Sequence, residues 1–322
     1  MEFSRRFKDH DSNVERIRKL EKLKEEILHI LRYFALFKHP LTKVELHQFL
    51  GVECAQDELN RNIQTMAELG EIKIIGGFIQ RNEDQDFTKL RIGKQERALD
   101  LIKKSRGYSR IIARFPFVRS VSISGSVSKL SAGEDADLDF FIVTASERLW
   151  ICRTLLHLFK KLTFITGHEN FFCMNYFVDD ANLRLPFENF YTALELQTLI
   201  PGFGNNTYEE LKNSNPWTTK YLPNHEGKPL ASVAEIKHTA LGKKLLEALF
   251  NLFFPRLINQ WLMRLTDWKW RKKFAPLNLS DQEYDQALMT RIHISKNHPH
   301  DFQKRILEAM EKEDGMEKNV YA

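Results

Sequence analysis

Residues 121–144 read VSISGSVSKLSAGEDADLDFFIVT, and they carry the strongest indication of the fold in the chain. Val121 and Ile123 alternate with serines as far as Gly125, which predicts a strand that ends at a Gly-Ser turn. Residues 138–143 are mostly apolar and β-rich, so they predict a second strand. The segment therefore predicts two neighbouring strands joined by a loop.

Two aspartates stand where the second strand begins. Asp137 and Asp139 are two residues apart, so on an extended chain both carboxylates point to one face, about 6.6 Å apart along the chain. Such a pair can hold Mg²⁺ together with water and substrate phosphates. At the turn, Gly125 lets the backbone approach a triphosphate closely, and Ser126 offers an N–H and a hydroxyl to its oxygens. The stretch predicts a site for a metal ion and a nucleotide.

The pattern of a hydrophobic strand, Gly-Ser, a gap of ten residues and Asp-Leu-Asp-Phe resembles the signature of the DNA polymerase beta-like nucleotidyltransferase superfamily. The resemblance is close over this stretch and loose over residues 110–200. It implies a small α/β catalytic domain with a mixed, twisted sheet and helices mostly on one side. It also implies that Asp137 and Asp139 bind two Mg²⁺ ions. Gly125 and Ser126 would cradle the β and γ phosphates.

The activity that the resemblance implies is transfer of a nucleoside monophosphate from an NTP, such as ATP, to a hydroxyl of an unidentified acceptor. One metal ion would lower the pKa of that hydroxyl and the other would clamp the triphosphate. In-line attack at the α-phosphorus would then expel pyrophosphate. Lys129 lies in the loop where family members often place a basic residue, so it either neutralises phosphate charge or faces solvent.

The sequence departs from the family at the third carboxylate, which active members supply from a later strand. The candidate strand is residues 171–178, and Asn175 fills the expected position. Asparagine coordinates weakly, brings no charge and cannot act as a base. Asp179 shares the face of Asn175 but lies about 13 Å farther along an extended strand. Three alternatives stay open: a weakly held acceptor-side metal, compensation by Asp179, Asp180 or another acid, or nucleotide binding without turnover.

The N-terminal part predicts three helices followed by a hairpin. Apolar residues at steps of three and four predict a helix over residues 14–37. Thr42 is placed to cap a short second helix, and residues 56–69 predict a third. Two β-rich runs on either side of Gly76-Gly77 predict a hairpin with a primed turn. This order of elements resembles a winged helix.

A winged helix serves either as a DNA reader or as a structural or protein-contact module. A DNA reader needs lysines and arginines on its recognition helix to meet phosphates and base edges. Here that helix, residues 56–69, carries Asp57, Glu58 and Glu68 against Arg61 alone. The charge pattern favours the structural role over groove binding.

The rest of the chain predicts helices and a turn-rich connection. Residues 83–114 predict a charged helical linker, residues 203–230 are polar and turn-rich, and the pattern from residue 234 onward is helical. Within that last part, residues 255–274 interleave six basic residues with aromatic ones. Such a stretch either binds nucleic acid by stacking and phosphate contacts, or forms a helix that buries tryptophans and solvates its charges.

The composition is that of an ordinary globular chain of 322 residues, 43% hydrophobic and 11% aromatic, which excludes disordered and low-complexity classes. Three widely separated cysteines predict neither a disulfide framework nor a CxxC zinc site, and they favour a reducing compartment. No apolar run reaches the roughly 18 residues of a membrane span, and the N-terminal residues predict no signal peptide. The net charge of +5 permits an anionic partner without requiring one.

Together these patterns predict an α/β protein of the α+β type. Its expected parts are a winged-helix-like domain over residues 1–82, a helical linker over 83–114, a nucleotidyltransferase core over 115–202, and a mainly helical region over 203–322. The predicted function is Mg²⁺-dependent nucleotidyl transfer in the cytoplasm, without a membrane partner. Two alternatives stay open: a nucleotide-binding sensor or scaffold with a degenerate transferase site, and a winged-helix DNA-binding regulator.

Overall fold

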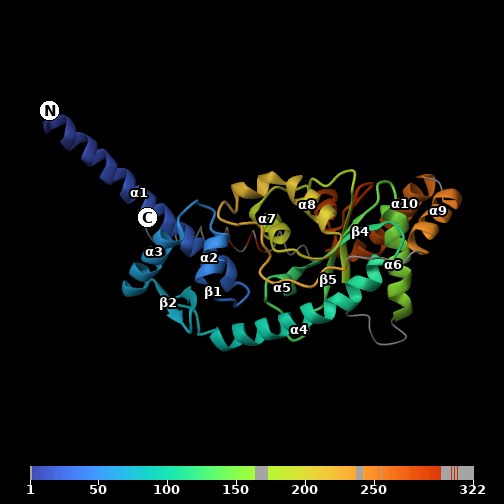
Figure 1. The fold of residues 1–322 in the computed structure, drawn as a ribbon, viewed down its shortest axis with the longest axis horizontal. Coiled ribbons are helices and arrows are strands. Elements are labelled where there is room, and N and C mark those ends of the chain that lie inside the picture. The colour runs from blue at the N-terminus through green and yellow to red at the C-terminus, as the bar shows by residue number, and fades with distance from the viewer. Residues whose placement is uncertain are drawn as a thin grey trace. The chain divides into compact units, whose positions relative to one another are not determined.

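The computed structural model describes residues 2–163, 173–236, 242–254 and 256–298, together with Ile306, Glu308 and Met310 (Figure 1). The described chain forms two compact units. The first comprises residues up to Gly93 and the segment Trp217–Gly227, with a C-terminal part that begins at Glu308. The second comprises Lys94–Pro216 and the described residues of Lys228–Leu307. The boundary at Gly93 therefore falls within the predicted linker.

The first unit contains the predicted helices and hairpin. Its elements are α1 (Glu2–Ala35), β1 (Leu41–Thr42), α2 (Lys43–Phe49), α3 (Gln56–Glu68), β2 (Ile72–Ile75) and β3 (Phe78–Arg81). The strands form a small antiparallel sheet in the order β1-β3-β2. Gly76 and Gly77 both have positive φ, at 58° and 85°, as the primed turn of the hairpin requires. Thr42 caps α2 as predicted, in a capping box with Glu45.

A buried ion pair ties the start of α4 (Thr88–Ala113) to α2 within this unit. Arg91 is 1% exposed and Glu45 is 5% exposed. Their side chains approach to 2.7 Å between Nη2 and Oε1, and Arg91 Nε also donates to the Pro40 carbonyl at 3.2 Å. Glu45 accepts a hydrogen bond from the Thr42 backbone N–H at 2.8 Å. One glutamate thus serves both the helix cap and the buried arginine.

The second unit is built on a six-stranded mixed sheet. Its strands are β4 (Val118–Ser124), β5 (Asp139–Thr144), β6 (Cys173–Asp179), β7 (Ile200–Phe203), β8 (Thr290–Arg291) and β9 (Ile294–Lys296), in the order β7-β4-β5-β6-β9-β8. Among these six strands, β5 and β6 pair in parallel and the other neighbours pair antiparallel. The sequence predicted the strands β4, β5 and β6, although residues 171 and 172 of the third lie outside the described residues. It did not anticipate β7 or the β8–β9 hairpin, which extends the sheet from the region expected to be mainly helical.

Helices complete this unit around an apolar core. They are α5 (Gly125–Ser128), α6 (Leu149–Thr163), α7 (Phe190–Gln197), α8 (Asn205–Asn213), α9 (Gly242–Phe253), α10 (Arg256–Phe274) and α11 (Asp281–Ala287). The core joins Ile112 of α4, Ile123 of β4, Phe140 of β5 and Trp150 of α6, each fully buried. The helix α6 contacts both β6 and α10. The helix α8 forms inside the stretch that the sequence predicted to be a turn-rich connection. The structure is a mixed α/β protein, as the sequence predicted.

Candidate active site

The predicted site lies where β4 ends and β5 begins, two inner strands of the six-stranded sheet that run side by side (Figure 1). β4 ends at Ser124, and antiparallel pairing places Ser124 opposite Asp139, the first residue of β5. β6 runs parallel to β5, and its first residue, Cys173, also pairs with Asp139. Asp139 is therefore flanked by the start of α5, which follows β4 directly, and by the start of β6.

The glycine of the Gly-Ser turn lies against the aspartate. Gly125 has a φ of +70°, a left-handed conformation that side chains with a Cβ rarely adopt. A Cβ at this position would overlap the Asp139 carboxylate. The missing side chain thus makes room for the protein's own acid, a role that the sequence did not predict. Ser126, the second residue of α5, is exposed, so the predicted Gly-Ser turn is in the structure the start of a short helix.

The first aspartate shares the face of the second. Asp137 precedes β5 and is exposed, whereas Asp139 is partly buried. Between and after them, Leu138 and Phe140 are fully buried in the core on the other side of the chain. This alternation agrees with the same-face arrangement predicted from the two-residue spacing. The two carboxylates are close enough that the charge of Asp137 raises the pKa of Asp139.

A β-bulge brings the third predicted position to the same place. Between the pairs made by Phe140 and Phe141, β6 contains one extra residue, Asn175. Its side-chain Nδ2 donates to Asp139 Oδ1 at 3.0 Å and contacts Cys173 Sγ at 3.1 Å. The third predicted position is therefore an amide that is hydrogen-bonded to the Asp139 carboxylate.

The electrostatics of the site centre on Asp139. Burial raises the pKa of Asp139 to about 6, and the charges of Glu195 and Asp137 act in the same direction. A hydrogen bond with the Cys173 thiol and the charge of Lys129 oppose that rise in pKa. Burial and the nearby Asp139 raise the pKa of Cys173 to about 11, so this thiol stays protonated at neutral pH. A bound cation would favour the ionised form of Asp139.

Lys129 is held beside the turn. Its Nζ donates to the Gly125 carbonyl at 3.0 Å and lies 2.7 Å from Oε1 of Glu195, on α7. The ammonium group is thus neither fully solvated nor remote from the site. Sequence reasoning missed Glu195, because it belongs to a helix with an ordinary core pattern and carries no motif of its own.

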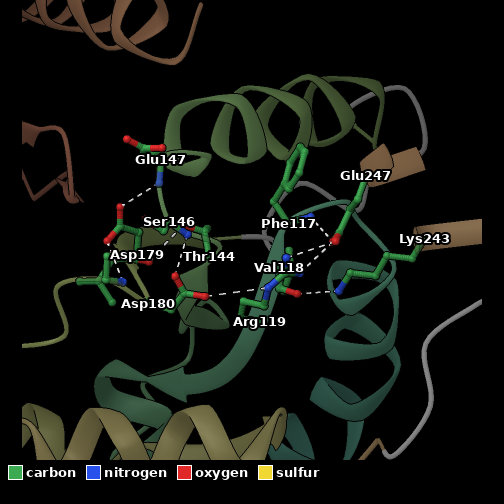
Figure 2. A network of polar contacts seen from close by, with 12 residues as sticks. Phe117, Val118, Arg119, Thr144, Ser146, Glu147, Asp179, Asp180, Lys243 and Glu247 are labelled. Atoms are coloured by element: carbon green, nitrogen blue, oxygen red, sulfur yellow. Dashed lines mark hydrogen bonds and ion pairs between the residues drawn. The ribbon is translucent and has the colours of Figure 1, made fainter. Parts of the chain in front are cut away.

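Asp179 lies at the opposite end of β6, where it pairs with Thr144, the last residue of β5. Its carboxylate is fully buried, 2.8 Å from Nδ1 of His293. It also accepts the backbone N–H of Glu147 at 3.3 Å (Figure 2). The structure does not bring Asp179 to Asp139. Its contacts instead fasten the β8–β9 hairpin to the end of β6.

The donor set suits a cation that keeps part of its own solvent shell. Asp137 and Asp139 offer hard carboxylate oxygens, while Asn175 turns its amide nitrogen toward Asp139. Within the ranges that the structure describes, no group of three or more His, Cys, Asp and Glu side chains could hold a metal ion. Mg²⁺ is commonly bound through one or two carboxylates, with water and substrate phosphates completing its shell. The residues present fit one such ion better than two.

The predicted recognition helix is acidic in the structure as well. On the exposed side of α3, the charged residues are Asp57, Arg61 and Glu68. Glu58 forms an ion pair with Lys19 at 3.1 Å, which links α3 to α1. The exposed charges of α3 would oppose a phosphate backbone rather than attract it.

The chain was compared with protein-family models, with curated proteins and with solved structures. No family model, no curated protein and no solved structure matches it. The function of the chain is therefore inferred from the geometry around Asp139.

Proposed function

We propose that the chain is an Mg²⁺-dependent nucleotidyltransferase, which moves a nucleoside monophosphate from an NTP such as ATP to an acceptor oxygen. The observation that carries the proposal is the contact between Gly125 and Asp139. A glycine in a left-handed turn at the end of one strand lies against the first carboxylate of the next. Asp137 stands beside it on the same face, and this arrangement supports the nucleotidyltransferase layout for the second unit.

Each residue of the site has a definite task in this proposal. Asp137 and Asp139 would hold Mg²⁺, which supplies charge neutralisation and polarisation of the phosphate when bound. Ser126 is exposed and offers donors to phosphate oxygens. Lys129, anchored on the Gly125 carbonyl, adds positive charge beside those donors. Because the pKa of Asp139 is about 6, its carboxylate is largely ionised and ready to bind a cation at neutral pH.

Asn175 restricts which acceptor oxygens could attack the nucleotide in this proposal. An amide cannot take a proton, so no base is available at that position for a neutral alcohol. An acceptor oxygen that is already anionic at neutral pH, such as that of a phosphate monoester, needs no base. The proposal therefore favours anionic acceptors over simple alcohols.

Pyrophosphate release tests the transferase directly. The chain with Mg²⁺ is incubated with each of the four common NTPs and a panel of phosphate monoesters and alcohols. We expect Asp137→Asn with Asp139→Asn to lower Mg²⁺-dependent release by about 1,000-fold or more. The matched control is Asp135→Asn, which removes an exposed carboxylate from the same loop and should leave release unchanged. Undiminished Mg²⁺-dependent nucleotide binding in the double variant would refute the metal site.

A second candidate is a nucleotide-binding sensor with a degenerate transferase site. The hydrogen bond from Asn175 to Asp139 favours it, because this bond uses a carboxylate oxygen that a metal ion would otherwise take. The sensor would bind NTP with Mg²⁺ and release no pyrophosphate with any acceptor. The panel above thus separates the two candidates.

Asn175→Asp probes the third position itself. It places a carboxylate about 3 Å from Asp139, where two like charges repel in the absence of metal. We expect the melting temperature to fall without Mg²⁺ and the apparent affinity for Mg²⁺ to rise by about tenfold above neutral pH. Isothermal titration and thermal melting measure both. The control Asn213→Asp makes the same change on the exposed side of α8, and an equal response there would exclude a metal position at Asn175.

For the first unit we propose a winged-helix layout with a structural or protein-contact role. Three helices and a three-stranded antiparallel sheet support the layout. The acidic exposed face of α3 supports a role other than reading DNA.

A further inference from the structure

Polar contacts of two charged residues help to hold helix α9 on the rest of the second unit (Figure 2). Lys243 is 7% exposed and donates through Nζ to the carbonyl oxygens of Ala113 and Val118. One turn later, Glu247 accepts the backbone N–H of Phe117 at 2.6 Å and pairs with Arg119 at 2.8 Å. An amphipathic helix of a globular protein normally docks through its apolar stripe. The docked face of α9 instead combines Lys243 and Glu247 with Phe250, which packs against the core and the Phe117 ring.

The rest of the apolar stripe of α9, without Phe250, points away from the core. Its members span about 120° of the helix circumference and are Leu245, Leu246, Leu249, Leu252 and Phe253, which are between 43% and 75% exposed. Helix α10 also exposes large apolar side chains: Leu257 is 72% exposed, and Trp261 and Trp268 are each 59% exposed. We call these eight residues the α9–α10 apolar surface. No described residue covers the five on α9 well enough to bury them.

The α9–α10 apolar surface is surrounded by positive charge. On α10, Arg264 and Lys272 follow Leu257, Trp261 and Trp268 on one face, at steps of three and four. Further exposed basic residues on the two helices are Lys244, Arg256, Lys269, Arg271 and Lys273.

The two acidic residues of the described parts of α9 and α10 are both engaged by partners. Glu247 is paired with Arg119, and Asp267 is paired with Arg271 and accepts a hydrogen bond from Thr290 at 2.6 Å. Asp267 thus offsets Arg271, and Glu147 offsets Arg256. The positive charge around the surface comes from the other basic residues, Lys244, Arg264, Lys269, Lys272 and Lys273.

We propose that the α9–α10 apolar surface docks on an anionic lipid bilayer, lying in the headgroup region with its leucines in the acyl boundary. Interfacial helices combine apolar side chains, tryptophans at headgroup level and a basic rim that attracts anionic lipids. No described helix is long and apolar enough to cross a membrane, and an interfacial helix has no need to be. The lack of a spanning segment, on which the sequence-based prediction of no membrane partner depends, leaves room for such docking.

Charge and apolar area together favour an anionic bilayer over a second copy of the chain or a nucleic acid as the partner of this surface. A second copy of the chain would bring two equally basic rims together, which is unfavourable. A nucleic acid would match the cations, as residues 255–274 suggested from sequence, but would leave the leucines and Phe253 of α9 in water. An anionic bilayer satisfies both the charge and the apolar surface. The proposal is independent of the transferase, because docking requires neither NTP nor Mg²⁺.

Vesicle flotation of the full chain tests the docking. One set of vesicles contains phosphatidylcholine alone and the other contains phosphatidylcholine with phosphatidylglycerol. We expect flotation with the anionic vesicles and at least about tenfold weaker partitioning to the neutral ones. Leu252→Gln with Phe253→Gln should weaken partitioning by about tenfold or more, and Lys272→Gln with Lys273→Gln by roughly 30-fold.

Matched controls make the same chemical changes elsewhere on the surface. Val44→Gln with Leu69→Gln replaces two exposed apolar residues of the first unit, and Lys103→Gln with Lys104→Gln removes two exposed charges of α4. Both controls should float like the unchanged chain. Absence of flotation, or flotation insensitive to the Leu252 and Phe253 changes, overturns the proposal.

Two further measurements identify the rival occupants. Light scattering that shows a dimer lost on changing Leu252 and Phe253, without flotation, assigns the surface to a second copy. Binding of a single-stranded oligonucleotide that depends on Lys272 and Lys273 but not on the leucines, without flotation, assigns it to nucleic acid. Either result overturns docking on lipid.

Discussion

Asp139→Asn is expected to abolish nucleotidyl transfer and, at neutral pH, to raise the free energy of unfolding by about 1–3 kcal/mol. The carboxylate is partly buried beside Gly125, and burial raises its pKa to about 6 from an ordinary value of 3.8. Folding therefore opposes the ionised form that a cation needs. A neutral amide of the same size removes that cost together with the charge. Pyrophosphate release and urea unfolding measure the two effects on the same samples.

The stability difference has a definite pH dependence. Because the pKa of Asp139 is raised in the folded state, the folded chain holds its proton more tightly than the unfolded chain does. Below about pH 4 Asp139 is protonated in both the folded and the unfolded state, so its buried carboxyl group does not lower the free energy of unfolding of the unchanged chain. Between about pH 4 and 6 the unchanged chain loses stability as pH rises, and above about pH 6 the loss is constant. The advantage of Asp139→Asn should follow this curve.

Asp179→Asn is the matched control, because it makes the same substitution at the other end of the sheet. The Asp179 carboxylate is fully buried but accepts hydrogen bonds from backbone N–H groups and lies against His293. Losing its charge should lower stability by about 2–3 kcal/mol and leave transfer intact. If Asp139→Asn proved destabilising to the same degree, Asp139 would be a structural carboxylate and the proposed site would lose its central residue.

Glu45→Ala is expected to lower the free energy of unfolding by about 3–5 kcal/mol. The change leaves the Arg91 guanidinium buried without its carboxylate partner, which lies 2.7 Å away. It also removes one half of the capping box with Thr42. Urea unfolding followed by circular dichroism measures the loss.

A second capping box in the chain separates the ion pair from the cap. Ser280 and Glu283 form the same box on α11, at a solvent-exposed helix start. Glu283→Ala should cost about 0.5–2 kcal/mol, the ordinary value of a cap. Equal losses at the two positions would show that Arg91 adds nothing. Replacing both charges, by Glu45→Leu with Arg91→Met, should restore much of the stability because neither charge then remains buried alone.

The elements that could be predicted from the sequence are those with strong local signals. Thr42 and Glu45 mark the start of α2, the glycines at 76 and 77 mark the hairpin, and the alternation after Val121 marks β4. The β8–β9 hairpin has only two or three residues per strand, too few for a periodic signal, and it forms because β9 pairs with β6 and β8 pairs with β9. The asparagines that begin and end α8 favoured turns in the sequence, although its apolar side, with Tyr208 and Leu211, is buried in the fold.

The candidate site likewise contains some residues that the sequence predicts and others that only the fold brings together. Gly125, Asp137 and Asp139 belong to one short pattern, and Asn175 could be found by searching the next strand for a third acid. The contact between Lys129 and Glu195 joins residues far apart in the chain. The bulge that turns Asn175 toward Asp139 is a property of the β5–β6 register. Neither feature leaves a local trace in the sequence, because each depends on which segments the fold brings together.

The close contact between Gly125 and the Asp139 carboxylate should make these two positions vary together in evolution. A larger residue at position 125 would displace the Asp139 side chain, and it would also have to adopt the left-handed backbone conformation of Gly125. A smaller residue at position 139 would leave unfilled space beside Gly125. Homologous chains should therefore either keep both Gly125 and Asp139 or have replaced both. In a collection of natural variants, a glycine retained beside a vanished aspartate would be the rarer combination, and pairs altered together would mark the branches in which the chemistry was given up.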